Sequence, residues 1–111
     1  MNYRILSTTN FVKQLKQLLK KYPSLPSDLE KLKIILEGNP KPGVSLGKDC
    51  VKIRLNITSK GEGKSGGTRI ITYVKIVNET IYLLTIYDKS ERETISPMEL
   101  QYLIDILSPK T

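Results

Sequence analysis

Apolar and polar residues alternate strictly from position 51 to position 57, in the run Val-Lys-Ile-Arg-Leu-Asn-Ile. Successive side chains of a strand point to opposite faces, so this pattern predicts a strand with its apolar residues on a core and with Lys52 and Arg54 together on the other face. The runs 68–77 and 81–89, rich in β-branched and aromatic residues, predict two more strands. If the three strands pair as successive hairpins, one surface of the sheet gathers cations and phenols, namely Lys52, Arg54, Arg69, Tyr73, Tyr87 and Lys89.

Helical periodicity precedes these strands. Residues 11–22 carry apolar side chains three and four positions apart, which predicts an amphipathic helix that ends at Pro23. Ser27 and Glu30 have the spacing of a capping box, so a second helix is expected to begin there and to end at Gly38. Its inward face is expected to consist of Leu29, Leu32, Ile35 and Leu36.

The two ends of the chain complete the predicted fold. Residues 3–7 are expected to add a short edge strand, and a capping box from Ser96 to Glu99 opens a last helix. The order strand, helix, helix, three strands, helix indicates an α+β fold. In it, an N-terminal helical hairpin and a C-terminal helix pack on a mainly antiparallel four-stranded sheet. No long linker divides the chain, so residues 1–111 are expected to form a single domain.

Positive charge is concentrated in the middle of the chain. The net charge is +7, and the segment from Lys41 to Lys75 holds eight Lys and Arg residues against two acidic ones. Such a segment attracts phosphate backbones through counterion release, which favours a nucleic acid as the partner. The alternative is a solvated surface that keeps a small protein soluble.

Other features of the composition indicate where the protein works. No apolar run is long enough to span a bilayer, and no signal peptide opens the chain, so no membrane partner is expected. The single cysteine, Cys50, has no partner for an internal disulfide, which is typical of a reducing compartment. These features together predict a cytoplasmic protein.

Two phosphate-binding motifs are present only in part. Residues 61–66 match G-x-G-x-x-G, but a strand pattern follows them where a dinucleotide site needs a helix N-terminus. The same loop ends like a P-loop, but Thr58 occupies the position of the required earlier glycine. The chain has no histidine and no Cys/His cluster, so we expect neither a metal nor a cofactor. Acid–base chemistry would depend on lysine, tyrosine, arginine or a carboxylate.

Several segments are specific in their combined order and spacing. They are the apolar stripe of residues 11–19 with the link Tyr22-Pro23-Ser24-Leu25-Pro26, the strand 51–55, the run Ser65-Gly66-Gly67-Thr68-Arg69-Ile70-Ile71, the run 82–89 and the closing helix. On these segments nearly the whole chain resembles the RelE/HigB family of type II toxin–antitoxin toxins. The resemblance implies a RelE-like fold, and it implies a cognate antitoxin, the ribosome and mRNA as partners.

The resemblance also implies a reaction and the residues that perform it. Members of the family cleave mRNA, often on the translating ribosome, by attack of a ribose 2′-OH on the adjacent phosphate. Cations stabilise the phosphorane, and lysine or tyrosine replaces the histidines of ordinary ribonucleases. Lys52 and Arg54 match the basic pair of the central strand, Arg69 matches the arginine that opens the next strand, and Lys89 matches the basic residue after the last strand.

The identity of the general base stays open. Several ribosome-dependent members have a tyrosine just before the C-terminal helix, where this chain has Ile95-Ser96. The candidates here are Lys52, Lys89 and Tyr87. Further residues of the basic region are expected to hold the RNA, namely Lys48, Lys60, Lys64, Tyr73 and Lys75.

Two other functions are compatible with the same fold. One is a ParE-type gyrase inhibitor that cuts nothing, and the other is an inactive module that binds only RNA or antitoxin. The cations of the central strands favour the endoribonuclease, because a gyrase inhibitor has no need of groups that stabilise a phosphorane.

Overall fold

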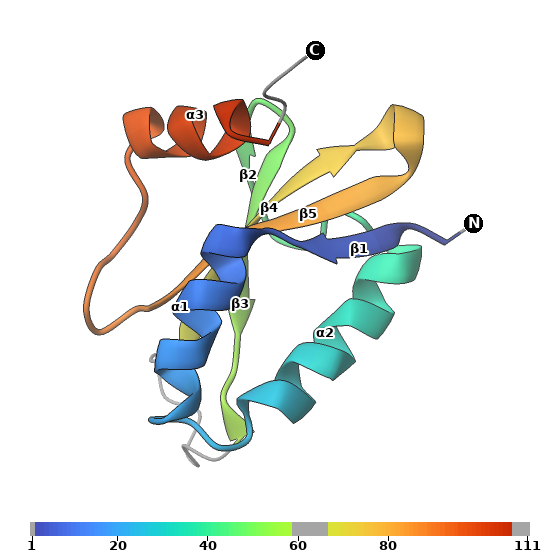
Figure 1. The fold of residues 1–111 in the computed structure, drawn as a ribbon. Helices are drawn as coiled ribbons and strands as arrows, with labels where there is room; N and C mark the ends of the chain where they lie inside the picture. The colour runs from blue at the N-terminus through green and yellow to red at the C-terminus, as the bar shows by residue number, and fades with distance from the viewer. Residues whose placement is uncertain (1, 59–66, 108–111) are drawn as a thin grey trace.

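The computed structural model describes residues 2–58 and 67–107. Within them, five strands form one mixed sheet in the order β1-β5-β4-β3-β2 (Figure 1). β1 lies parallel to β5, and the other neighbouring strands are antiparallel. In chain order the elements are β1 (Arg4–Ser7), α1 (Thr9–Leu19), α2 (Leu25–Gly38), β2 (Val44–Gly47), β3 (Cys50–Leu55), β4 (Thr68–Lys75), β5 (Thr80–Asp88) and α3 (Pro97–Asp105). The predicted α+β fold is confirmed, with one strand more than expected.

α1 and α2 cover one face of the sheet. α1 begins where the Thr8 side chain accepts a hydrogen bond from Phe11 N, and both helices lie on the same side of the strands (Figure 1). Their apolar side chains meet the alternating apolar residues of β3 in the larger core. That core includes Phe11, Leu25, Leu29, Leu36, Val51, Ile53, Leu55 and Ile57. The predicted register of the 51–57 strand is therefore confirmed, and Lys52 and Arg54 point to the other face.

The predictions for α2 need two corrections. The helix begins at Leu25, with Ser24 at the N-cap and Pro26 in the first turn, so Ser27 is not its cap. Proline is favoured in a first turn, where its missing N–H leaves no bond unmade, and this permits the earlier start. Ile35 was expected to face inward, but it is 53% exposed. Leu25, Leu29, Leu32 and Leu36 already occupy the core stripe, and Ile35 lies on its flank.

β2 is the strand that the sequence pattern did not predict. It is short and mostly exposed, so it lacks the apolar alternation of a half-buried strand. A tight hairpin joins it to β3, and Gly47, Lys48 and Asp49 all have positive φ angles there. Glycine adopts this conformation easily, whereas other residues adopt it much less often. Consecutive non-glycine residues in it are uncommon, which explains why this hairpin was not expected.

A β-bulge in β5 redirects the side chains that follow it. Ile71 pairs with Thr85 and Thr72 pairs with Leu83, so Leu84 is the extra residue. Leu83 and Ile86 consequently lie in the larger core, while Leu84 and Tyr87 lie on the opposite face. α3 packs on that opposite face over Cys50, Ile71 and Leu84. Its start is as predicted, because the Ser96 side chain accepts a hydrogen bond from Glu99 N.

Candidate functional site

A cleft of about 700 Å³ lies beside β3 and collects cations from separate parts of the sheet. Its charged wall consists of Lys52 and Arg54 of β3, Arg69 of β4 and Lys89, which follows β5. Its apolar wall consists of Leu32, Ile35, Pro42, Val44 and Ile53. Gly43 and Glu93 complete the lining. The structure therefore brings together the four cations that the strand patterns placed on one surface.

Strand pairing fixes the relation between these cations. Arg54 and Arg69 are direct cross-strand partners, and Lys52 lies two residues before Arg54 on the same face. Arg69 is only 6% exposed, and its Nη1 donates to the Thr68 carbonyl at 3.2 Å. Within residues 2–58 and 67–107, no ion pair includes Lys52, Arg54 or Lys89. Among the described residues, four cations and one carboxylate, that of Glu93, therefore line the cleft, and this excess of positive charge favours an anionic ligand.

Lys89 is held at the cleft by its neighbour Asp88. The Asp88 carboxylate is buried and accepts hydrogen bonds from Lys21 Nζ at 2.8 Å, Tyr22 Oη at 2.6 Å and Ser90 N at 2.9 Å. Burial raises the pKa of Asp88, but these donors outweigh it and hold the pKa well below its ordinary value. The Lys89 amide also donates to the Gly67 carbonyl at 3.2 Å. The end of β5 is thereby tied both to the link between α1 and α2 and to the start of β4.

Tyr87 shares the face of the cations but does not line the cleft. It is 6% exposed and packs in the core cluster beneath α3 with Ile95. The Arg92 guanidinium lies 5.0 Å from its ring centroid. Burial raises the pKa of Tyr87 against the opposing charges of Arg92 and Arg69, and its Oη has no hydrogen-bond partner among the described residues. Proton transfer by Tyr87 would require the segment around Arg92 to move.

The residues expected to hold RNA are not gathered at the cleft. Lys48 lies in the β2–β3 turn and donates to Gln101 Oε1 of α3. Tyr73 stacks on Tyr82, with ring centroids 6.2 Å apart. Lys75 ends β4, about 20 Å along the strand from Arg69 at roughly 3.3 Å per residue. Lys60 and Lys64, with the glycine loop that contains them, lie outside the described residues.

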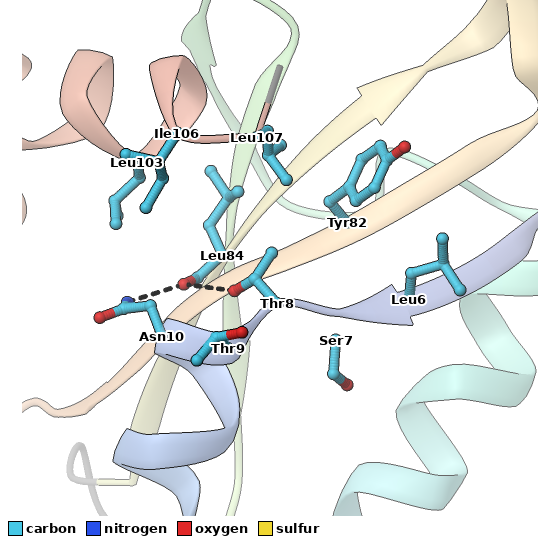
Figure 2. Close-up of a pocket in the computed structure, with 10 residues that line it drawn as sticks. All are labelled: Leu6, Ser7, Thr8, Thr9, Asn10, Tyr82, Leu84, Leu103, Ile106 and Leu107. Atoms are coloured by element: carbon cyan, nitrogen blue, oxygen red, sulfur yellow. Dashed lines mark hydrogen bonds between the residues drawn. The ribbon is translucent and has the colours of Figure 1, made fainter. Parts of the chain in front are cut away.

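A second cavity, of about 410 Å³, lies between α3 and the start of α1. Figure 2 shows its apolar walls, Leu6, Tyr82 and Leu84 on one side and Leu103, Ile106 and Leu107 on the other. Thr8 Oγ1 and Asn10 Nδ2 are bonded to the Leu84 carbonyl, at 3.3 and 2.9 Å (Figure 2). Among residues 2–58 and 67–107, no charged side chain lines this cavity, so it lacks the cations with which the cleft beside β3 could bind a phosphate.

The apolar wall of the cleft was not predicted from sequence. The sequence pattern places Ile35 in the core and Pro42 in a turn, and it gives Val44 no element. The available signal was the pair Ile34-Ile35, which gives α2 more apolar residues than one buried stripe uses.

In the part of the chain that the structure describes, no group of three or more Cys, Asp and Glu side chains is placed to bind a metal ion.

Comparison with known proteins identifies the family. A family model described as the RelE toxin of the RelE / RelB toxin-antitoxin system matches residues 4–108. The chain belongs to the RelE toxin family. Its structure is also similar to that of a free E. coli toxin RelE in which two arginines are replaced by alanine, with a TM-score of 0.59 and 19% sequence identity. The match covers 84% of this chain and 90% of the E. coli chain, and it shows a shared fold.

Membership of this family has one direct consequence for partners. RelE proteins are the toxin components of toxin–antitoxin systems, so an antitoxin is the partner that the family implies. None of the helices in residues 2–58 and 67–107 is long and apolar enough to cross a membrane.

Proposed function

We propose that this RelE-family toxin is an endoribonuclease that cleaves mRNA on the translating ribosome. One observation carries the proposal: Lys52, Arg54, Arg69 and Lys89 line one cleft, although they come from three different parts of the sheet. A cleft of this composition fits one phosphodiester and the charge that develops on it during cleavage.

The proposed reaction needs no group beyond the RNA and these side chains. The ribose 2′-oxygen attacks the adjacent phosphorus, and the bond from phosphorus to the 5′-oxygen breaks. The products are a 2′,3′-cyclic phosphate and a 5′-hydroxyl. Negative charge grows on the phosphorane oxygens, where Arg54 and Arg69 are best placed to donate, because guanidinium groups bind phosphate in a bidentate manner.

Two proton transfers accompany the attack. A base removes the 2′-hydroxyl proton, and an acid returns a proton to the leaving 5′-oxygen. Lys52 and Lys89 lie in the same cleft and are the candidates for these transfers. Tyr87 is less suited in the conformation described, because it is buried and its raised pKa disfavours the phenolate.

Induction of the toxin in growing cells tests the function. Newly formed mRNA 5′ ends are mapped while ribosome positions are recorded on the same transcripts. The proposal expects new 5′-hydroxyl ends inside translated codons within minutes of induction, and none on messages whose start codon is removed. Growth arrest with intact mRNA and with accumulated DNA breaks would instead identify a gyrase inhibitor of the same fold.

A further inference from the structure

The cleft beside β3 has two chemically different walls. Lys52, Arg54, Arg69 and Lys89 form the charged wall, and Ile35 of α2 and Val44 of β2 are the exposed side chains of the apolar wall. Ile35 is 53% exposed and Val44 is 62% exposed, so neither is used by the core. Apolar surface next to a phosphate site can bind the apolar part of a ligand that also carries a phosphate.

Backbone packing holds the apolar wall against the charged one. Gly43 lies so close to β3 that a Cβ at this position would be 2.1 Å from the Lys52 carbonyl oxygen. Val44 then pairs with Lys52 across the β2–β3 ladder. On the other side, Leu32 is buried in the core one helical turn before Ile35 and fixes the position of Ile35 at the rim. The two apolar side chains are therefore positioned by the packing of α2 and by the β2–β3 ladder.

We infer that Ile35 and Val44 form a subsite for the nucleobase that flanks the phosphate bound by the cations; this rests on the proposed function. A nucleotide has the required composition, with an anionic phosphate and a flat base whose faces are apolar. The cavity volume of about 700 Å³ lies within the range of roughly 300–1,000 Å³ that is typical of small-molecule sites. Aliphatic side chains offer no hydrogen bonds, so the subsite selects by contact area and favours a purine over a pyrimidine.

Binding of short non-cleavable probes tests the inference directly. The probes are 2′-deoxy dinucleotides that differ only at one base, with a purine, a pyrimidine or no base at that position. Each is titrated against the parent chain and against Ile35→Ala, Val44→Ala and Ile34→Ala. Ile34 is the matched control, because it is the adjacent residue of α2, is 68% exposed and does not line the cleft.

The expected result is a loss of about 10-fold in affinity for the purine probe in Ile35→Ala and Val44→Ala. Affinity for the abasic probe should not change, and Ile34→Ala should bind every probe as the parent chain does. Equal binding of purine and abasic probes by the parent chain would overturn the inference. So would an Ile35→Ala variant that cannot be distinguished from Ile34→Ala, or one that loses only its affinity for an antitoxin.

The outcome is separable from the fate of the proposed function. If the chain cuts mRNA but binds the purine and abasic probes equally, the subsite is refuted and the enzymatic function stands. If the chain prefers the purine probe in an Ile35-dependent manner but cuts no mRNA, the subsite stands and the enzymatic function is refuted. Ile35→Leu adds a check on folding, because it preserves apolar contact and should restore purine binding.

Discussion

Arg54 of β3 and Arg69 of β4 are direct cross-strand partners, although both carry a positive charge. Like charges that face each other across a ladder destabilise a sheet. Arg54 is exposed, while Arg69 is almost fully buried. An arrangement that weakens the fold is expected at a site that binds an anionic ligand.

Replacing Arg54 by glutamine should therefore separate stability from function. The Arg54→Gln variant should raise the free energy of unfolding by about 0.5 kcal/mol, because one of the two facing charges is removed. Its cleavage rate should fall by about 100-fold or more, as expected for loss of a group that stabilises the transition state. Urea unfolding and a cleavage assay on programmed ribosomes measure the two effects. A variant that is both less stable and fully active would contradict this account of the pair.

Asp88 is expected to be the main stability determinant of the cleft. The Asp88→Asn variant removes a buried charge that holds Lys21, Tyr22 and Ser90, and it should lower the free energy of unfolding by about 3 kcal/mol. Asp49→Asn is the control, because Asp49 is exposed and lies 3.9 Å from its partner Lys41. That control should change stability by less than about 0.5 kcal/mol. Comparable losses in the two variants would refute the role of Asp88.

The same residue predicts how stability depends on pH. Because the pKa of Asp88 is lower in the folded chain than in the unfolded chain, its contribution is complete above the unfolded value of about 3.9 and is lost as the pH falls below it. Thermal unfolding between pH 6 and about pH 2.5 should show a steeper loss for the parent chain than for Asp88→Asn. Parallel curves for the two proteins would show that Asp88 is not the titrating group.

Tyr87 gives a prediction that concerns both folding and catalysis. Its buried hydroxyl has no hydrogen-bond partner in the part of the chain that the structure describes, so removing it should not destabilise the protein. Tyr87→Phe is expected to unfold at the same or a slightly higher urea concentration. It should also keep its cleavage rate to within about threefold, because the phenol lies outside the cleft. A loss of activity with unchanged stability would instead show that Tyr87 enters the cleft when RNA binds.

Cys50 should be unreactive in the folded protein. It is buried in β3, and burial is the main cause that raises its pKa to about 11, so only about one thiol in a thousand is ionised at pH 8. Iodoacetamide should label Cys50 in urea but only very slowly in native buffer. Rapid labelling of the native chain would show that the region between β3 and α3 opens readily.

The cationic wall could be predicted from sequence because it depends on local rules. Strict alternation placed Lys52 and Arg54 opposite the apolar residues of the same strand, and successive hairpin pairing then brought Arg69 alongside them. The relation of Lys89 to these residues is different. Lys89 was also predicted to lie on this face, but its position depends on the bulge at Leu84, which reverses the facing of every later residue in β5, and no residue type in that run indicates a bulge.

The apolar wall could not be predicted because it depends on competition between residues. Ile35 and Leu32 both fit the helical spacing of the core, and only the packed structure shows which of them the sheet can accommodate. Val44 was obscured by a hairpin that uses positive φ angles at Lys48 and Asp49. The separation of Tyr73 and Lys75 from the cleft follows from their distance from Arg69 along β4, whereas the bond of Lys48 to Gln101 of α3 is a result of tertiary structure.

Single-turnover cleavage of mRNA on purified ribosomes, measured together with co-sedimentation in a salt series, tests the central claim most directly. The variants are Arg69→Ala and Lys89→Ala, with Lys33→Ala as a control whose lysine pairs with Glu30 on α2 and does not line the cleft. The account predicts that both cleft variants lose about 100- to 1,000-fold in rate while their ribosome binding largely survives, and that the control changes neither. If activity falls only in proportion to lost binding, the cleft is an electrostatic contact surface, and the catalytic role of its cations is contradicted.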